Sequence, residues 1–293
     1  MPRNDTGNPE YYIIINHILH VIIVILLLMG YIGNLLNFIL LYKEKSLREF
    51  TKILYFAQGF WDVVVLTIPS IRYYFLISQE YDLRSINITF SMIHTFFTYI
   101  GFDCSVWQLC AISLERTALV KWPTNQFVRK LSWKHAILIC ILIFICALLK
   151  DFTSINSGNL NEILMAILDD VFGIVIPFAI IVITSVMLIK KLQARFNQVN
   201  TNSTHSQQMA SPIFTIKMIL VTSFYYLITN IIGSLYFITV AIVTPEDVKL
   251  DKLLYNCVVT FLISNNALKF YLYSISSRRI RKDIFFMFKY PCK

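Results

Sequence analysis

The stretch 13–42 reads IIINHILHVIIVILLLMGYIGNLLNFILLY and contains no acidic residue, lysine or arginine. About twenty apolar residues in a helix are enough to cross ~30 Å of hydrocarbon, so this stretch predicts a membrane-spanning helix. A secretory signal peptide would have a shorter apolar run behind a basic segment, whereas the residues before position 13 are mainly polar. We therefore expect a permanent span.

Further apolar blocks follow along the chain, separated by short polar and basic segments, at 53–78, 88–120, 136–149, 163–189, 213–243 and 253–274. Hydrophobic residues make up 57% of the chain and charged residues only 15%. A soluble domain carries roughly a quarter charged residues. The blocks lack the alternation of a membrane barrel, and helices satisfy their own backbone groups in lipid. We therefore expect an all-α membrane protein, a seven-transmembrane helix bundle.

The chain divides into an amino-terminal tail (1–12), the seven-span domain (13–274) and a carboxyl-terminal tail (275–293). In this last tail, apolar residues fall on one helical face and basic residues elsewhere, which predicts a short amphipathic helix in the inner membrane interface. Cys292 follows that helix and is a candidate palmitoylation site, with an unmodified thiol as the alternative.

The distribution of charge predicts the orientation. With the amino terminus outside, nineteen Lys and Arg residues face the cytoplasm and six face outward. The positive-inside rule therefore places the carboxyl terminus in the cytoplasm, here of a plasma-membrane protein. The net charge of +9 then faces anionic lipid and cytosolic partners rather than nucleic acid. Two sequons, at Asn4 and Asn87, lie on the outer side and are candidate glycosylation sites.

Acidic residues show the opposite bias, with eleven of seventeen on the outer side. A negatively charged outer opening of the helix bundle would attract a cationic ligand. The alternative is that exposed loops simply carry solvated charge.

A series of motifs appears in the order and spacing of a known family. Span one carries Gly33-Asn34, span two Asp62, and span three ends in Ser113-Leu114-Glu115-Arg116-Thr117 with Pro123 beyond it. Pro177 lies in span five, and span seven contains Asn265 and Tyr273. The set resembles the rhodopsin-like G-protein-coupled receptors over nearly the whole chain, and implies a receptor that carries an extracellular signal to a heterotrimeric G protein.

The resemblance implies a role for the end of span three. In resting family members the arginine pairs with the adjacent acid, here Arg116 with Glu115, and activation releases it so that a G-protein helix can enter. Pro123 and Tyr273 occupy the family's positions beside this cytoplasmic cleft. The alternative for Arg116 is a helix-end charge reaching the headgroups.

A second set of positions resembles the family's intramembrane polar network: Asn34, Asp62, Ser105, Asn265 and Lys269. Asp62, Ser105 and Asn265 match positions that hold a sodium ion in many relatives. Lys269 replaces the usual asparagine, and a buried ammonium is costly unless it is paired. We therefore hypothesise that Lys269 reaches Asp62 and takes the place of sodium. The alternative is that Lys269 extends to the cytoplasmic face.

Several departures set this chain apart. The usual outer disulfide is absent, and Lys269-Phe270 replaces Asn-Pro. Thr98 stands where amine receptors carry aspartate, which disfavours a small amine. The candidate ligand pocket comprises Thr98, Asp103, His94 and Tyr99, and outer aromatic residues favour a peptide with a basic or amidated end.

Other functions remain as alternatives. A chemosensory or poorly coupling receptor is the nearest one, and an ion- or proton-coupled transporter or channel is another, since charged residues lie within spans. The sequence has no catalytic triad order, phosphate loop or metal-ligand spacing, so neither an enzyme nor a cofactor is expected.

Overall fold

The structure, a computed structural model, describes residues 9–43, 47–79, 81–156, 170–199, 206–242, 248–276, 281 and 285. Within these ranges, the side chains are described except at 9–10, 153–156, 192, 195–199, 206–220, 223, 241–242, 248–249 and 273–276. Every regular element in these ranges is a helix. The predicted all-α class is therefore confirmed for the described residues.

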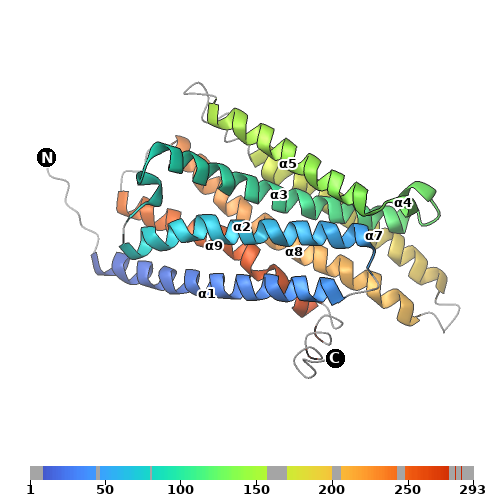
Figure 1. The fold of residues 1–293 in the computed structure, drawn as a ribbon. Helices are drawn as coiled ribbons and strands as arrows, with labels where there is room; N and C mark the ends of the chain where they lie inside the picture. Colours follow the sequence, from blue (N-terminus) through green and yellow to red (C-terminus); the bar gives the residue numbers. More distant parts are fainter. Residues whose placement is uncertain are drawn as a thin grey trace.

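Long helices make up the body of the molecule (Figure 1). They are α1 (Pro9–Lys43), α2 (Glu49–Gln79), α3 (Ile88–Lys121), α5 (Trp133–Asn156), α7 (Ile176–Val199), α8 (Ser206–Ile242) and α9 (Val248–Ser276). Short elements lie between them: η1 (Leu83–Ser85), α4 (Gln126–Lys130) and the π-helical turn η3 (Val171–Val175).

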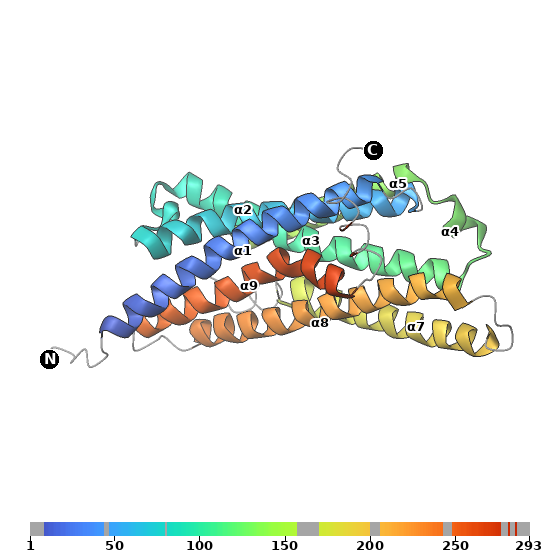
Figure 2. The same ribbon diagram turned by 90° about the horizontal axis from the view of Figure 1, so that it is seen from below.

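The long helices run side by side (Figures 1 and 2). Contacts link α1, α2, α3, α7, α8 and α9 into a ring, and α5 packs against α2 and α3. Helix α1 packs between α2 and α9, while α7, α8 and α9 follow one another, and α3 contacts α2, α5 and α7. Glycine allows the closest approach of α1. A Cβ atom at Gly30 would lie 2.6 Å from Leu66 and 3.2 Å from the backbone of Ala267, so this position has no room for a side chain.

Among the described residues, four helices are long and apolar enough to cross a membrane: Tyr11–Lys43, Glu49–Gln79, Trp133–Phe152 and Val171–Lys191. A shorter apolar segment covers Phe224–Val240. The side chains are also arranged as lipid requires. Large apolar residues such as Ile18, Leu28 and Leu142 are exposed along the outside, whereas many polar residues are buried between the helices. These features indicate a membrane protein.

The structure corrects the end of the fourth apolar block. We expected the span to stop at 149, with Lys150 and Asp151 in an outer connection. Instead α5 continues to Asn156, and Asp151 is 3% exposed. The reason is that Lys150 pairs with Asp103 of α3 as well as with Asp151, so the charges enter the bundle together. The start of the fifth block and nearly all of the predicted tail helix lie outside the described residues.

Candidate functional site

The middle of the bundle contains a buried cation with three acceptors. Lys269 Nζ of α9 lies 2.6 Å from Asp62 Oδ1 of α2, 2.8 Å from Ser105 Oγ of α3 and 3.1 Å from Asn266 Oδ1. Asp62, Ser105 and Lys269 are at most 5% exposed. An ammonium has three N–H donors, and here each has an acceptor. The desolvation cost of the buried charge is thereby offset, and Lys269 bonds inside the bundle instead of extending to its end.

The Ser105 hydroxyl completes this centre. It accepts from Lys269 and donates to Asp62 Oδ1 at 2.5 Å, so one carboxylate oxygen receives two hydrogen bonds. The centre therefore joins α2, α3 and α9 at one point. We name Asp62 and Lys269, together with their hydrogen-bond partners Ser105 and Asn266, the core ion pair.

Two expected members of the network lie apart from the core ion pair. The Asn34 amide donates to the Gly30 carbonyl of its own helix at 2.9 Å. Asn265 is buried, and its Oδ1 has no hydrogen-bond partner among the described atoms. Asn266, which we did not predict, takes the position in the polar network that we expected for Asn265. The signal was available in the spacing, because Asn266 precedes Lys269 by one helical turn.

The end of α3 nearest α4 carries the second candidate site. Arg116 Nε lies 3.6 Å from Glu115 Oε2, and the Glu115 side chain is 2% exposed. Thr51 of α2 donates to Glu115 Oε1 at 2.7 Å. A further guanidinium, that of Arg48, lies 3.7 Å from the same oxygen. The contact expected between Arg116 and Glu115 is thus present, whereas Thr51 and Arg48 were not predicted.

Pro123 and Tyr273 are the other two positions that we expected beside Glu115 and Arg116. Pro123 is exposed in the turn between α3 and α4. The backbone of Tyr273 lies in the last turns of α9, and its side chain is outside the described residues.

Asp103 of the expected ligand pocket lies in the half of the bundle away from α4. Its carboxylate is 2.5 Å from Lys150 Nζ. It also faces the η3 turn, since a Cβ atom at Gly173 would come within 3.3 Å of Asp103 Oδ1. Lys150 was not predicted as a site residue because the hydropathy pattern ended the span before it.

A tyrosine explains why η3 is stable in this place. Pro177 has no N–H, so the carbonyl of Gly173 lacks the donor that a regular helix would supply. The Tyr226 hydroxyl of α8 donates to this carbonyl at 2.6 Å. The Ile176 N–H instead bonds to the Val171 carbonyl, five residues back, which forms the π-helical turn.

The remaining pocket candidates do not gather around Asp103. His94 Nε2 is 3.0 Å from the Ile68 carbonyl of α2, and Thr98 donates to the His94 carbonyl of its own helix. Tyr99 is 49% exposed on the outside of α3. Of the four expected positions, Asp103 forms an ion pair with another helix, through Lys150 of α5.

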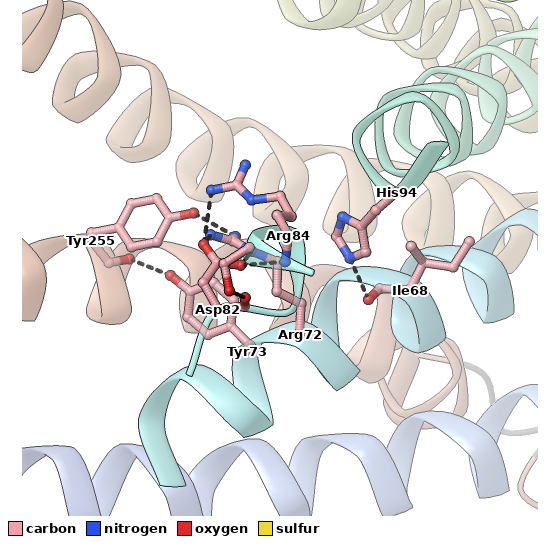
Figure 3. Close-up of polar contacts among 8 residues, drawn as sticks. Ile68, Arg72, Tyr73, Asp82, Arg84, His94 and Tyr255 are labelled. Atoms are coloured by element: carbon pink, nitrogen blue, oxygen red, sulfur yellow. Dashed lines mark hydrogen bonds and ion pairs between the residues drawn. The ribbon is translucent and has the colours of Figure 1, made fainter. Parts of the chain in front are cut away.

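The connection between α2 and α3 is held by a buried arginine (Figure 3). Arg72 of α2 is 6% exposed and donates to both carboxylate oxygens of Asp82 at 2.7 and 2.6 Å. Its third contact is the Tyr255 hydroxyl of α9, at 3.0 Å. Asp82 also accepts from the Arg84 backbone and side chain. This cluster fixes η1 against α2 and α9.

Asp82 predicts a pH dependence of stability. Hydrogen bonds from Arg72 hold the pKa of its carboxyl well below the ordinary value of 3.8. The stabilisation that ionised Asp82 gives to the folded protein is therefore fully present at pH values above 3.8 and is lost as the pH falls below 3.8. We expect the difference in melting temperature between the native chain and Asp82→Asn to stay constant from pH 7 to pH 5 and to shrink towards pH 3. A constant difference down to pH 3 would contradict this.

Four of the acidic residues expected on the outer side have partners inside the protein. Asp82 pairs with Arg72 and Asp151 with Lys150, whereas Asp170 accepts from Ser234 and Asp251 from Tyr236. This favours structural charge over a negatively charged outer opening for these four residues. Asn87 caps α3 by accepting from the Phe90 N–H at 2.6 Å, while Asn4 and Cys292 lie outside the described residues.

Comparisons with known proteins add no identification. The sequence matches no family model, and no characterised protein matches it significantly.

Proposed function

We propose that this chain is a rhodopsin-like G-protein-coupled receptor, with seven spans, its amino terminus outside and its Glu115–Arg116 pair as the G-protein switch. The pair itself is the observation that carries the proposal. It combines a buried carboxylate with a permanently charged, partly exposed guanidinium at the α4 end of the central helix. A planar fork can exchange one hydrogen-bonding partner for another without changing its charge.

The ordered core supports a receptor more than a transporter. Charged residues in an ion path must exchange partners with water or ions during transport. Here the core ion pair uses all three donors of Lys269, and Lys150, another cation within the described helices, faces two carboxylates. Charges that are paired in this way hold the helices to one another. A receptor that switches between two arrangements of its helices needs such fixed contacts.

The proposed ligand is a peptide with a basic or amidated end. Asp103 and Lys150 present one charge of each sign in the half of the bundle proposed to face outward. A cationic ligand group would compete with Lys150 for Asp103, and its binding would alter the α3–α5 contact. Such a competition links ligand binding to helix α3, which also carries Arg116.

The test is G-protein activation in cells expressing the intact chain, exposed to basic and amidated peptides and to the same peptides with free carboxyl ends. We expect a ligand-dependent signal that Arg116→Ala abolishes at equal surface expression. Lys121→Ala, which removes an exposed cation from the end of the same helix, should leave the signal intact. Silence of the native chain at the surface, together with a proton-coupled current, would support the transporter alternative instead.

A further inference from the structure

Arg48 connects two cytoplasmic elements that are far apart in sequence. It precedes α2, and its own carbonyl accepts the Lys52 N–H at 3.0 Å, which fixes its backbone to the start of that helix. Its Nη2 atom donates to the carbonyls of Val128, Arg129 and Leu131 at 3.0, 3.3 and 3.0 Å. Val128 and Arg129 lie in the last turn of α4 and Leu131 is its C-cap, where carbonyls lack partners within the helix.

The other terminal nitrogen of Arg48 faces Glu115. Arg48 Nη1 lies 3.7 Å from Oε1 and Arg116 Nε lies 3.6 Å from Oε2, so the two guanidinium groups share one carboxylate. Both distances exceed those of a hydrogen bond. Arg48 Nη1, Glu115 Oε2 and Arg116 Nε are all buried and have no hydrogen-bond partner in the described part of the chain. The Glu115 carboxylate therefore accepts a hydrogen bond from Thr51 and lies between two guanidinium groups at similar distances.

We propose that Arg48 is the second guanidinium of the switch: it holds α4 in place and retains Glu115 when Arg116 leaves. This inference rests on the proposed function, because it describes the activation of the same site. A buried carboxylate that lost its only cation would oppose the release of Arg116. Arg48 and Thr51 remain beside Glu115 and lower that cost, so Arg48 favours the active state.

The same side chain makes the position of α4 depend on Glu115. A guanidinium presents its N–H groups in a rigid fork, so Nη1 and Nη2 cannot turn independently. A shift of Nη1 towards Glu115 therefore moves Nη2 and the carbonyls of α4 that it binds. The connection between α3 and α5, a cytoplasmic surface in the proposed topology, would respond to the state of Arg116.

The experiment compares Arg48→Gln, Arg48→Lys and the control Lys52→Gln in the full-length chain, purified into lipid nanodiscs. Lys52 is one turn away and pairs with the exposed carboxylate of Glu49, so its replacement tests the loss of a cation at this end of α2. Two quantities are measured: subsecond amide hydrogen exchange of the peptide 126–131, and nucleotide exchange on an added heterotrimeric G protein without ligand.

We expect Arg48→Gln to raise amide exchange in 126–131 about tenfold, since hydrogen bonds to a charged donor stabilise local structure by at least that factor. Nucleotide exchange should fall about tenfold, within the usual range of coupling between sites. Arg48→Lys keeps the charge without the fork, so it should restore nucleotide exchange and leave amide exchange raised. Lys52→Gln should change neither.

The inference is overturned if Arg48→Gln leaves either quantity at the native value, or if Lys52→Gln changes both equally. A native chain that activates the G protein alongside a fully active Arg48→Gln overturns this inference alone. A native chain that activates no G protein overturns the proposed function, and the switch role of Arg48 with it.

Discussion

Replacing Lys269 by methionine should lower the free energy of unfolding by about 3–5 kcal/mol, because Asp62 would keep a buried charge without its cation. The pair is 2.6 Å apart with both side chains at most 7% exposed, so solvent screens it little. Methionine has a similar volume, which limits the contribution of an empty space. Thermal unfolding in detergent, followed by tryptophan fluorescence, measures the loss. Lys52→Met provides a control at a pair whose carboxylate is solvent-exposed.

A double variant separates charge from packing. Asp62→Asn combined with Lys269→Met removes both charges, so it should recover most of the stability lost in the single variant. A double variant no more stable than Lys269→Met would show that the core ion pair contributes through shape alone.

Sodium provides an independent readout of the same centre. Lys269 Nζ occupies the position beside Asp62 and Ser105, so the stability of the native chain should be equal in sodium and potassium chloride. In Lys269→Met the carboxylate regains room for a small cation, and sodium should stabilise this variant by mass action. Stabilisation of the native chain by sodium would contradict the account.

Some contacts of the core ion pair could be predicted from the sequence, and others could not. The contact between Lys269 and Asp62 was one of two alternatives. It was suggested by the resemblance to a family in which these positions form a sodium site, together with the cost of an unpaired ammonium in lipid. The packing reason for Gly30 could not be predicted, because it depends on how closely α1 approaches α2 and α9. The choice of Asn266 over Asn265 likewise depends on the rotation of α9.

Charged residues near the helix ends were the least predictable. Lys150, Arg72 and Arg48 were all read as charges that mark one side of the membrane, because a charge count assigns each ion to a side without regard to a partner. In the structure each is bound to a carboxylate from another part of the chain. A buried pair is invisible to a pattern that treats residues singly, because the partner lies on another element.

The second large effect concerns Glu115, whose charge should hold the proposed receptor in its resting state. Glu115→Gln keeps the shape and can still accept from Thr51, but it removes the anion that faces Arg116. Arg116 would then leave at lower cost, and basal activity should rise about fivefold or more. Arg116→Ala removes the group that the G protein would contact, and basal activity should vanish.

The most direct measurement of the central claim is therefore nucleotide exchange on a purified heterotrimeric G protein, with the native chain, Glu115→Gln and Arg116→Ala in matched nanodiscs. No ligand is required, because the two variants shift the switch in opposite directions. The account predicts faster exchange with Glu115→Gln than with the native chain, and with Arg116→Ala the rate of empty nanodiscs. Equal rates for all three chains and for empty nanodiscs would contradict it.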